Sequence, residues 1–415
     1  MAAEQSDVCS FLLIDLDQFK SINDMLGHQT GDDALSAFAA RIAEAMPEDA
    51  LLARLGGDEF AAVLPGTDIA AAAVIGERLL AHLKPSFLAG TRTIDLRASI
   101  GISAFPVDGR GYSALIDHAD LALYSAKDAG GAMVRTFAPI LAARRQRELA
   151  KLRHARLALA KGWIEPFYQP KIILASGQTS GFEALLRWRH PRVGLQLPHT
   201  IAHAFDDSHL AAMLGGAMAE AVLADMGIWA DQGTSFGKIA INVSAAELRK
   251  PDYASGLLMR LHRHGIAATD IELEITETAF LEERAGIVIA ALGTLRAAGM
   301  TVALDDFGTG FSSLSHLRNF PVDTIKIDSS FVVGLENNGR DRDIIKAVLQ
   351  LGNALGMTTV AEGIENEAQA DFLATHGCAL GQGFYFAPAL PADEAIEWAE
   401  KFGSRGPGKF PSVSH

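Results

Sequence analysis

The sequence contains little cysteine, no long hydrophobic run and no excess of basic residues. Its two cysteines, Cys9 and Cys378, cannot form a disulfide framework, and their spacing is not typical of a zinc site. The longest apolar runs, near Ala71 and Gly286, fall well short of the roughly 20 residues that a membrane-spanning helix needs. The N-terminus is acidic and does not resemble a secretory signal. We therefore expect a cytoplasmic protein with reduced thiols and no membrane span.

The charge of the chain restricts its ligands. A net charge of −14 argues against binding to polymeric nucleic acid, which requires a basic face. Small phosphorylated ligands remain compatible with this charge if metal ions neutralise them locally. A length of 415 residues and a hydrophobic content of 49% suit two or three globular domains with large cores.

Apolar and helical segments divide the chain into regions. From residue 11 to 137, runs such as FLLI, FAAVL and RASIGISAF alternate with helical patterns, which predicts an α/β domain. A charged segment of strong helix formers follows, and it predicts a connecting helix. The predicted organisation is a first domain at 1–137, a linker helix at 138–160, a second domain at 161–402 and a flexible tail at 403–415.

The second domain has the pattern of a (β/α)₈ barrel. Apolar strands such as KIAINVS, IELEIT, TVALDD and TIKID alternate with helical stretches over about 250 residues, the usual size of that fold. Polar residues follow strand after strand, and in a barrel all these strand ends lie on one face. The residues concerned are Glu183, Asn242, Glu274, Asp305, Asp306, Lys326, Glu362 and Gln382.

These strand-end residues are informative mainly as a set. Each residue also has a structural explanation when it is considered alone. Glu274 could form a salt bridge and Asn242 could stabilise a turn. Asp306 could be a helix N-cap and Lys326 could be a structural counter-ion. Together they form an oxygen-rich set suited to Mg²⁺ or Mn²⁺. Two ions would relieve the repulsion between Asp305 and Asp306, about 4 kcal/mol for charges 4 Å apart at an effective dielectric constant of 20. Paired metals are typical of phosphoester hydrolysis.

Several motifs resemble those of EAL domains, the cyclic di-GMP phosphodiesterases, in order and approximate spacing. The motifs are FYQP from Phe167, GFEALLRW, INVS, ELEITE, ALDDFGTGFSSLSHL, IKID, VAEGIE and GQGFYF, and they cover roughly residues 150–402. The resemblance implies a TIM-like barrel that hydrolyses cyclic di-GMP to linear pGpG by a two-metal mechanism. It also leaves open a homodimer through this domain.

The resemblance assigns roles to individual residues. Two Mg²⁺ or Mn²⁺ ions would be held by Glu183, Asn242, Glu274, Asp305, Asp306 and Glu362. Catalysis would depend on Lys326, which would hold the attacking water, together with Glu362 and Glu183. The dinucleotide would contact Gln169, Arg187 and Gln382, and Glu277 would brace the loop from Asp306 to Leu314. The segment Pro198–Leu210 departs from the family pattern, and His262 and His264 receive no role because no third ligand accompanies them.

The first domain carries RLGGDEF at Arg54–Phe60, which alone predicts only a hairpin turn. With FLLIDLDQFKSINDMLGHQTGDDAL before it and ASIGISAF and ADLALYSAK after it, the region resembles GGDEF domains, the diguanylate cyclase family, whose fold is a nucleotidyl-cyclase-like α/β sheet. The resemblance implies binding of GTP and Mg²⁺. The nucleotide and metal residues it implies are Asp15, Lys20, Asn23, Asp32, Gly56, Gly57, Asp58, Glu59 and Lys127.

Three departures argue against efficient cyclisation. Only ten residues precede Phe11, so the domain is expected to be shortened at its N-terminus. The usual Lys-x-x-Gly-Arg-Asn reads Lys127–Ala132 without an arginine, which removes a bidentate phosphate contact. The product-inhibition motif Arg-x-x-Asp reads Pro47–Ala50. We therefore expect a GTP-binding regulatory domain; a bifunctional cyclase/phosphodiesterase and a noncatalytic cyclic di-GMP receptor remain the alternatives.

Overall fold

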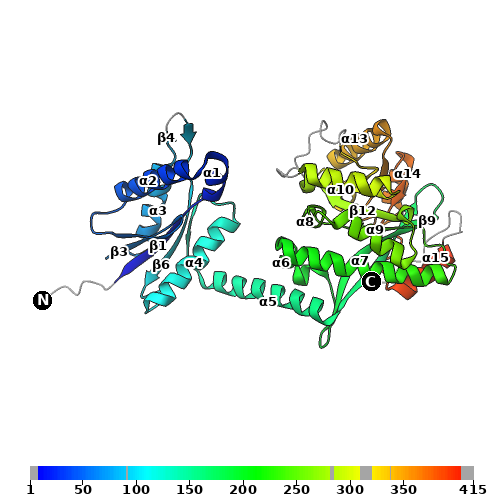
Figure 1. Ribbon diagram of the computed structural model, residues 1–415, viewed down its shortest axis with the longest axis horizontal. Coiled ribbons are helices and arrows are strands. Elements are labelled where there is room, and N and C mark those ends of the chain that lie inside the picture. The colour runs from blue at the N-terminus through cyan, green and yellow to red at the C-terminus, as the bar shows by residue number, and fades with distance from the viewer. Residues whose placement is uncertain (1–7, 90–91, 281–284, 309–319, 337, 403–415) are drawn as a thin grey trace. The chain divides into compact units, whose positions relative to one another are not determined.

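The computed structural model describes residues 8–89, 92–280, 285–308, 320–336 and 338–402. The chain divides into two compact units, Met1–Ala150 and Lys151–His415 (Figure 1). The boundary falls inside helix α5 (Pro139–Lys161), where the sequence predicts the linker helix. The predicted tail at 403–415 lies outside the described residues.

The first unit is built on a five-stranded sheet in the order β2-β3-β1-β6-β7. β1 pairs antiparallel with β3 and β6, β2 pairs antiparallel with β3, and β6 pairs parallel with β7. These strands are β1 (Cys9–Leu16), β2 (Leu51–Gly56), β3 (Glu59–Pro65), β6 (Ala98–Phe105) and β7 (Val134–Thr136), and β4 (Phe87–Ala89) pairs with β5 (Arg92–Ile94). The helices are α1 (Phe19–Leu26), α2 (His28–Ala45), α3 (Ile69–Leu83) and α4 (Tyr112–Asp128).

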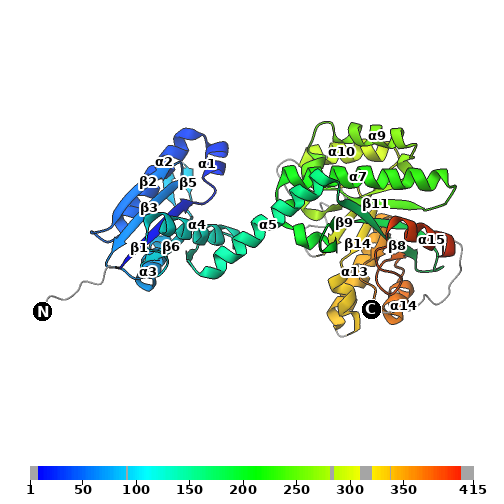
Figure 2. The same cartoon turned by 90° about the horizontal axis from the view of Figure 1, so that it is seen from below.

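Helices cover both faces of this sheet, as Figure 2 shows for α3 and α4. On one face Ile14 packs with Phe38 of α2 and Leu79 of α3. On the other face Leu13 packs with Leu123 of α4. Because successive residues of β1 point to opposite faces and both faces are covered, the strand is apolar without alternation.

Each half of helix α5 contacts the unit to which it belongs. Within the first unit, Arg144 pairs with Asp128 and Glu148 at 2.5 and 3.0 Å. Within the second unit, Ala155 and Ala158 are fully buried in a cluster with Trp188. The helix is therefore supported by ion pairs in its first half and by packing in its second half, as well as by its helix-forming composition.

The second unit contains a closed eight-stranded barrel. Neighbouring strands follow the order β9-β11-β12-β13-β14-β15-β16-β8, and β8 closes the circle by pairing with β9. The strands are β8 (Ile164–Ile173), β9 (Thr179–His190), β11 (Lys238–Asn242), β12 (Ile271–Thr276), β13 (Thr301–Phe307), β14 (Thr324–Ile327), β15 (Thr358–Ala361) and β16 (Leu380–Gly381). A short strand, β10 (Gly194–Gln196), pairs only with β9. The predicted barrel is confirmed, with one refinement: β8 runs antiparallel to both of its neighbours.

Helices surround the barrel. The longer ones are α7 (Ser208–Asp231), α9 (Tyr253–His264), α10 (Ala285–Ala297), α13 (Gly339–Leu355), α14 (Glu367–Thr375) and α15 (Ala392–Phe402). The short ones are α6 (His203–Asp206), α8 (Ala245–Leu248) and α12 (Ser329–Val333), with 3₁₀ turns at Pro198–Ile201, Ala268–Asp270, Glu277–Phe280 and Gly334–Glu336. Outward-facing strand residues such as Ile239, Leu273 and Val302 are fully buried beneath these helices.

Among the described helices, only α7 is long and apolar enough to cross a membrane by length and composition. Met218, Val222 and Leu223 of α7 are buried in the core that covers the barrel. A core helix passes the same test, so α7 is weak evidence for a membrane span.

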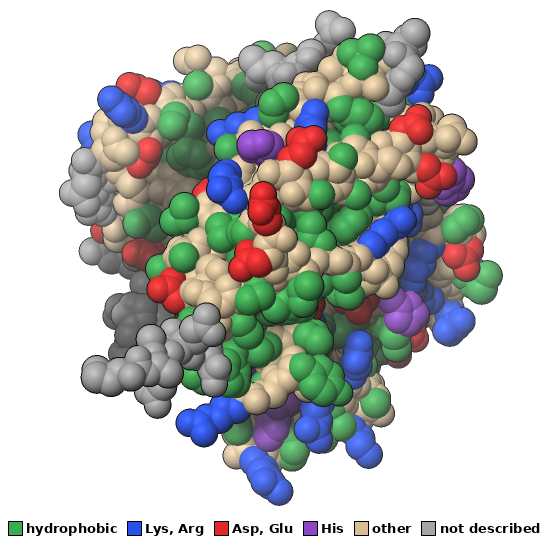
Figure 3. All heavy atoms as spheres, turned by 90° about the vertical axis from the view of Figure 1, so that its left-hand side faces the viewer, with side chains coloured by type: hydrophobic (Ala, Val, Ile, Leu, Met, Phe, Trp, Pro, Cys, Tyr) green, Lys and Arg blue, Asp and Glu red, His purple; other side chains and the backbone are tan. Residues whose placement is uncertain are grey.

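On the face drawn in Figure 3, acidic, basic and apolar side chains are interspersed.

Candidate active site

Acidic side chains from four barrel strands surround the ammonium group of Lys326. The Nζ atom lies 2.5 Å from Glu274 Oε2, 2.6 Å from Glu362 Oε1, 3.0 Å from Asp305 Oδ1 and 3.4 Å from Glu183 Oε2. Glu274 is on β12, Asp305 on β13, Glu183 on β9, and Glu362 directly follows β15. The structure thus brings these strand-end residues together at one rim, and we call the four acids and Lys326 the rim cluster.

Amide side chains hold Glu183 within the rim cluster. Asn242 Nδ2 donates a hydrogen bond of 3.0 Å to Glu183 Oε1, and Gln382 Nε2 donates one of 2.7 Å to Glu183 Oε2. Gln382 Nε2 also donates to Gln169 Oε1, 2.9 Å away, and Gln169 Nε2 donates to the carbonyl of Ala387. Both oxygens of Glu183 are therefore fixed by neutral donors.

Arg187 lies four residues after Glu183 on the long strand β9, so both side chains leave the same face of that strand. The guanidinium is half-buried: Nη1 donates to the carbonyl of Leu186 at 2.8 Å, and Cζ lies 5.9 Å from the ring centroid of Phe167. It stands on the face of β9 that carries Glu183.

A β-bulge places the Asp305–Asp306 pair. The pairing of β13 with β14 shifts register between Leu304 and Phe307, and Asp306 adopts a left-handed conformation with φ of 54°. In a regular strand adjacent side chains point to opposite faces, whereas a bulge re-aims them. The amide of Asp306 donates to Asp305 Oδ1 at 3.0 Å. The order of apolar and polar residues in this strand did not predict the bulge.

Glu277 contacts the start of the loop that follows β13. Its Oε1 accepts a hydrogen bond of 3.2 Å from the amide of Gly308. The remainder of the loop that it is predicted to brace, residues 309–314, lies outside the described residues.

The rim carries more negative than positive charge. If every carboxyl group were ionised, the five acids Glu183, Glu274, Asp305, Asp306 and Glu362 would carry four more formal charges than the ammonium group of Lys326 balances. Burial raises the pKa of Glu274 well above its usual value and the pKa of Glu362 to about 7. Burial opposes ionisation of Glu183 too, but Lys326, Gln382 and Asn242 outweigh it and lower its pKa to about 2.

The donor chemistry of this rim suits hard divalent cations. All of its ligand atoms are carboxylate or amide oxygens, and the excess charge equals that of two divalent ions. Within the described residues, Glu274 Oε1 and Gln382 Oε1 are buried without a hydrogen-bond partner. Four of the carboxylates meet at Lys326 Nζ. Among the described residues, no three Asp, Glu, His or Cys side chains stand as ligands around one metal position. In donor chemistry and formal charge the residues fit the ions, although the described side chains do not stand as ligands around one point.

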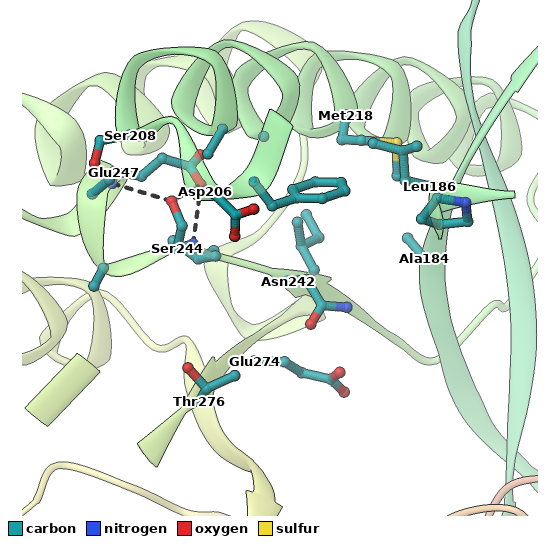
Figure 4. A pocket seen from close by; sticks show the side chains of 18 of the residues that line it. Ala184, Leu186, Asp206, Ser208, Met218, Asn242, Ser244, Glu247, Glu274 and Thr276 are labelled. Carbon is teal, nitrogen blue, oxygen red and sulfur yellow. Dashed lines mark hydrogen bonds between the residues drawn. The ribbon is translucent and has the colours of Figure 1, made fainter. Parts of the chain in front are cut away.

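A cavity of about 560 Å³ adjoins the rim cluster. Figure 4 shows Asn242 and Glu274 reaching toward it from neighbouring strands and Asp206 approaching from the opposite side. Pro198, Phe205 and Asp206 also line it, so the segment that departs from the family pattern forms part of its wall. That departure was the only sequence signal for these lining residues.

The first unit also brings predicted residues together. Asp15, at the end of β1, is the register partner of Glu59, and Lys127 Nζ lies 2.8 Å from Asp15 Oδ2. Burial raises the pKa of Asp15, and Asp58 is close enough for its charge to add to this shift. These acids stand next to the hairpin at Gly56 and Gly57, where Gly57 adopts a positive φ of 52°.

Two of the predicted nucleotide residues, Asn23 and Asp32, are also neighbours. A Cβ atom on Gly31 would lie 1.9 Å from Asn23 Oδ1, so the side chain of Asn23 rests against the backbone next to Asp32. Lys20, on α1, and Asp32 are exposed.

Sequence reasoning missed Asp17 as a residue of this site. Its Oδ2 accepts a hydrogen bond of 2.8 Å from the amide of Ala132, and its Oδ1 accepts one of 2.7 Å from Ser99. Asp17 therefore anchors the loop in which Gly131 replaces the expected arginine. The sequence signal was the second aspartate of the IDLD run.

Comparisons with known proteins match both units. The family model described as "EAL domain" matches residues 151–389, and the one described as "Diguanylate cyclase, GGDEF domain" matches residues 1–133. A solved structure of the MucR phosphodiesterase in complex with c-di-GMP is 34% identical, with a TM-score of 0.56, covering 59% of this chain and 99% of that one.

Curated relatives span both matched regions. The bifunctional diguanylate cyclase/cyclic di-GMP phosphodiesterase MucR of Pseudomonas aeruginosa is 36% identical over 93% of this chain and 56% of its own length. The cyclic di-GMP phosphodiesterase PdeR of Escherichia coli is 32% identical over 94% of this chain and 58% of its own length. The chain spans about half the length of the curated relatives it matches.

Proposed function

Because this chain belongs to the EAL domain family and carries a GGDEF domain before the barrel, we propose that it is a cytoplasmic, cyclic-guanylate-specific phosphodiesterase that hydrolyses cyclic di-GMP to linear pGpG. The observation that carries the proposal is the rim cluster, in which four carboxylates meet around Lys326. Relatives described as cyclic di-GMP phosphodiesterases support the substrate.

Two Mg²⁺ or Mn²⁺ ions are proposed as cofactors of the barrel. Their ligands would be Glu183, Asn242, Glu274, Asp305, Asp306 and Glu362. Bound divalent ions would neutralise the rim, polarise the phosphodiester and lower the pKa of water toward neutrality. Without them, the four surplus negative charges would repel a dinucleotide that carries two phosphate groups.

The chain's own side chains would bind and orient the reactants. Lys326 is buried among carboxylates whose charges raise its pKa, so it would be protonated in its proposed role of holding the attacking water. Gln169 and Gln382 present amide groups beside Glu183, where they could contact the dinucleotide. Arg187 can offer paired N–H donors to a phosphate group.

The cavity beside Asn242 and Glu274 supports a ligand of nucleotide size. Its volume of about 560 Å³ falls in the range of typical small-molecule sites, and it opens directly on the rim. A base held there would bring an attached phosphate group toward the carboxylates, because Asn242 and Glu274 belong to both the cavity and the rim.

The first unit is proposed to bind GTP with Mg²⁺ and to regulate the barrel. Asp15, Asp58 and Glu59 are grouped at the hairpin, which supports metal and nucleotide binding. The loop anchored by Asp17 carries Gly131 where the family has arginine, and this loss argues against rapid cyclisation.

The proposal is tested by incubating the full chain with cyclic di-GMP and Mn²⁺ or Mg²⁺, and by measuring pGpG by chromatography. We expect turnover that EDTA abolishes and that Glu183→Ala and Asn242→Ala reduce at least about 100-fold, because replacing residues that only orient metal ligands already costs 10–100-fold. Lys238→Met, at the opposite end of β11 from Asn242, serves as the matched control. Tight binding of cyclic di-GMP without pGpG release would instead identify a receptor.

A bifunctional enzyme is the second candidate, because the acids of the first unit are in place and one relative is described as bifunctional. The test is incubation of the Glu183→Ala variant with GTP and Mg²⁺. Accumulation of cyclic di-GMP would establish cyclase activity, whereas GTP binding without product would support the regulatory role.

A further inference from the structure

A second layer of charged side chains lies inside the barrel beneath the rim cluster. Lys171 on β8 and Glu272 on β12 are each two residues from a rim residue, Gln169 and Glu274, so they share the inward face of their strands. Only 2% of Lys171 and 7% of Glu272 are exposed. Lys171 directly follows the FYQP motif and Glu272 is the first residue of ELEITE, but neither residue has one of the roles assigned above.

Lys171 contacts acids of both layers. Its Nζ lies 2.5 Å from Glu272 Oε1 and 3.6 Å from Glu274 Oε1. The other oxygen of Glu274, Oε2, lies 2.5 Å from Lys326. Glu274 is therefore held between two ammonium groups, one at each carboxylate oxygen.

Glu272 fixes the position of Lys171 from below. While its Oε1 accepts from Lys171, its Oε2 accepts a hydrogen bond of 3.0 Å from Thr324 Oγ1. Thr324 is two residues before Lys326 on β14, so this contact belongs to the same lower layer. The contact with Glu272, which is itself held by Thr324, therefore fixes the position of the Lys171 ammonium group.

A buried Lys–Glu pair has a simple structural explanation, which is mutual neutralisation of Lys171 and Glu272. That explanation leaves out Glu274, whose Oε1 has no hydrogen-bond partner within the described residues and has Lys171 as its cationic neighbour. If Lys171 were only the partner of Glu272, exchanging both residues for apolar ones would not affect Glu274.

We propose that Lys171 is a positioning residue of the metal site: it holds Glu274 from the lower layer, with Oε1 directed down and Oε2 directed to the centre of the rim cluster. This inference rests on the proposed role of Glu274 as a metal ligand. Residues that orient metal ligands in this way typically change metal affinity or activity 10–100-fold when they are replaced.

The test uses the full chain and Mn²⁺ alone as the probe. In the double variant Lys171→Met/Glu272→Leu, the ion pair is replaced by apolar side chains of similar size, an exchange that often leaves stability unchanged. Calorimetric titration is expected to show Mn²⁺ affinity about tenfold weaker than that of the wild type, with the same melting temperature in EDTA. Glu272→Gln, which keeps Lys171, is expected to retain wild-type affinity.

Lys238→Met is the matched control, because it removes a lysine from the opposite end of β11 and is expected to bind Mn²⁺ like the wild type. Equal or tighter Mn²⁺ binding by the double variant would overturn the positioning role and leave the proposed function intact. A wild-type chain that bound no Mn²⁺ would overturn both. Weaker binding together with an unchanged melting temperature would support the positioning role over a purely structural one.

Discussion

Replacing Lys326 by methionine removes the one ammonium group of the rim cluster. At an effective dielectric constant of 20, unit charges 3 Å apart attract by about 5 kcal/mol, and Lys326 has four such neighbours at 2.5 to 3.4 Å. Mutual repulsion of the carboxylates and the desolvation of the lysine offset part of this sum. Breaking a buried ion pair typically costs 3–5 kcal/mol, and we expect a loss of about that size for the metal-free barrel.

The assay is urea unfolding of Lys326→Met and wild type at pH 8, in EDTA and in Mn²⁺, followed through the unfolding transition of the barrel. In EDTA the variant should be less stable by about 3–5 kcal/mol. Because divalent ions supply the missing positive charge, Mn²⁺ should stabilise the variant more than the wild type. The variant should form no pGpG even in Mn²⁺. Lys238→Met should behave like the wild type. Equal stability in EDTA, or an identical response to Mn²⁺, would refute this electrostatic reasoning.

Three further outcomes follow from single contacts. Tyr168→Phe removes a buried hydrogen bond of 2.6 Å to Asp225 Oδ2 and should lower the free energy of unfolding by about 1–3 kcal/mol in urea titrations; an unchanged midpoint would contradict the contact. Gly31→Ala places a Cβ 1.9 Å from Asn23 Oδ1, so calorimetry should show weaker GTP binding with pGpG formation retained. Burial raises the pKa of the Cys378 thiol to about 11, so at pH 8 it should react with a disulfide reagent only after urea is added; rapid native labelling, checked against Cys378→Ser, would refute this.

The barrel and the rim were predictable because both depend on local patterns. Strand after strand ends in a polar residue, and parallel barrel strands end on one face, so Glu274 and Asp305 were expected at the same rim before any coordinates. The fold class was confirmed for both units. The assignment of metal ligands, substrate contacts and GTP residues remains a prediction that the experiments above test.

Other features could not be read from local patterns. The antiparallel direction of β8 follows from its pairing with β9 and β16, partners distant in sequence. The bulge at Asp305–Asp306 follows from how β13 meets β14. Lys171 resembled an ordinary strand residue between Pro170 and Ile172, and only its contact with Glu274 separates it from a simple structural lysine.

By itself, the amino-acid sequence determined which residues carry charge, which segments are apolar enough to become buried strands, and in what order the acidic motifs occur. The tertiary structure alone decided that four acids share one lysine, that Glu274 lies between two ammonium groups, and that residues near Phe205 line a cavity. The physical reason is range: strand and helix periodicity arises between near neighbours, whereas the energy of a buried charge depends on every group that folding brings within a few ångströms of it.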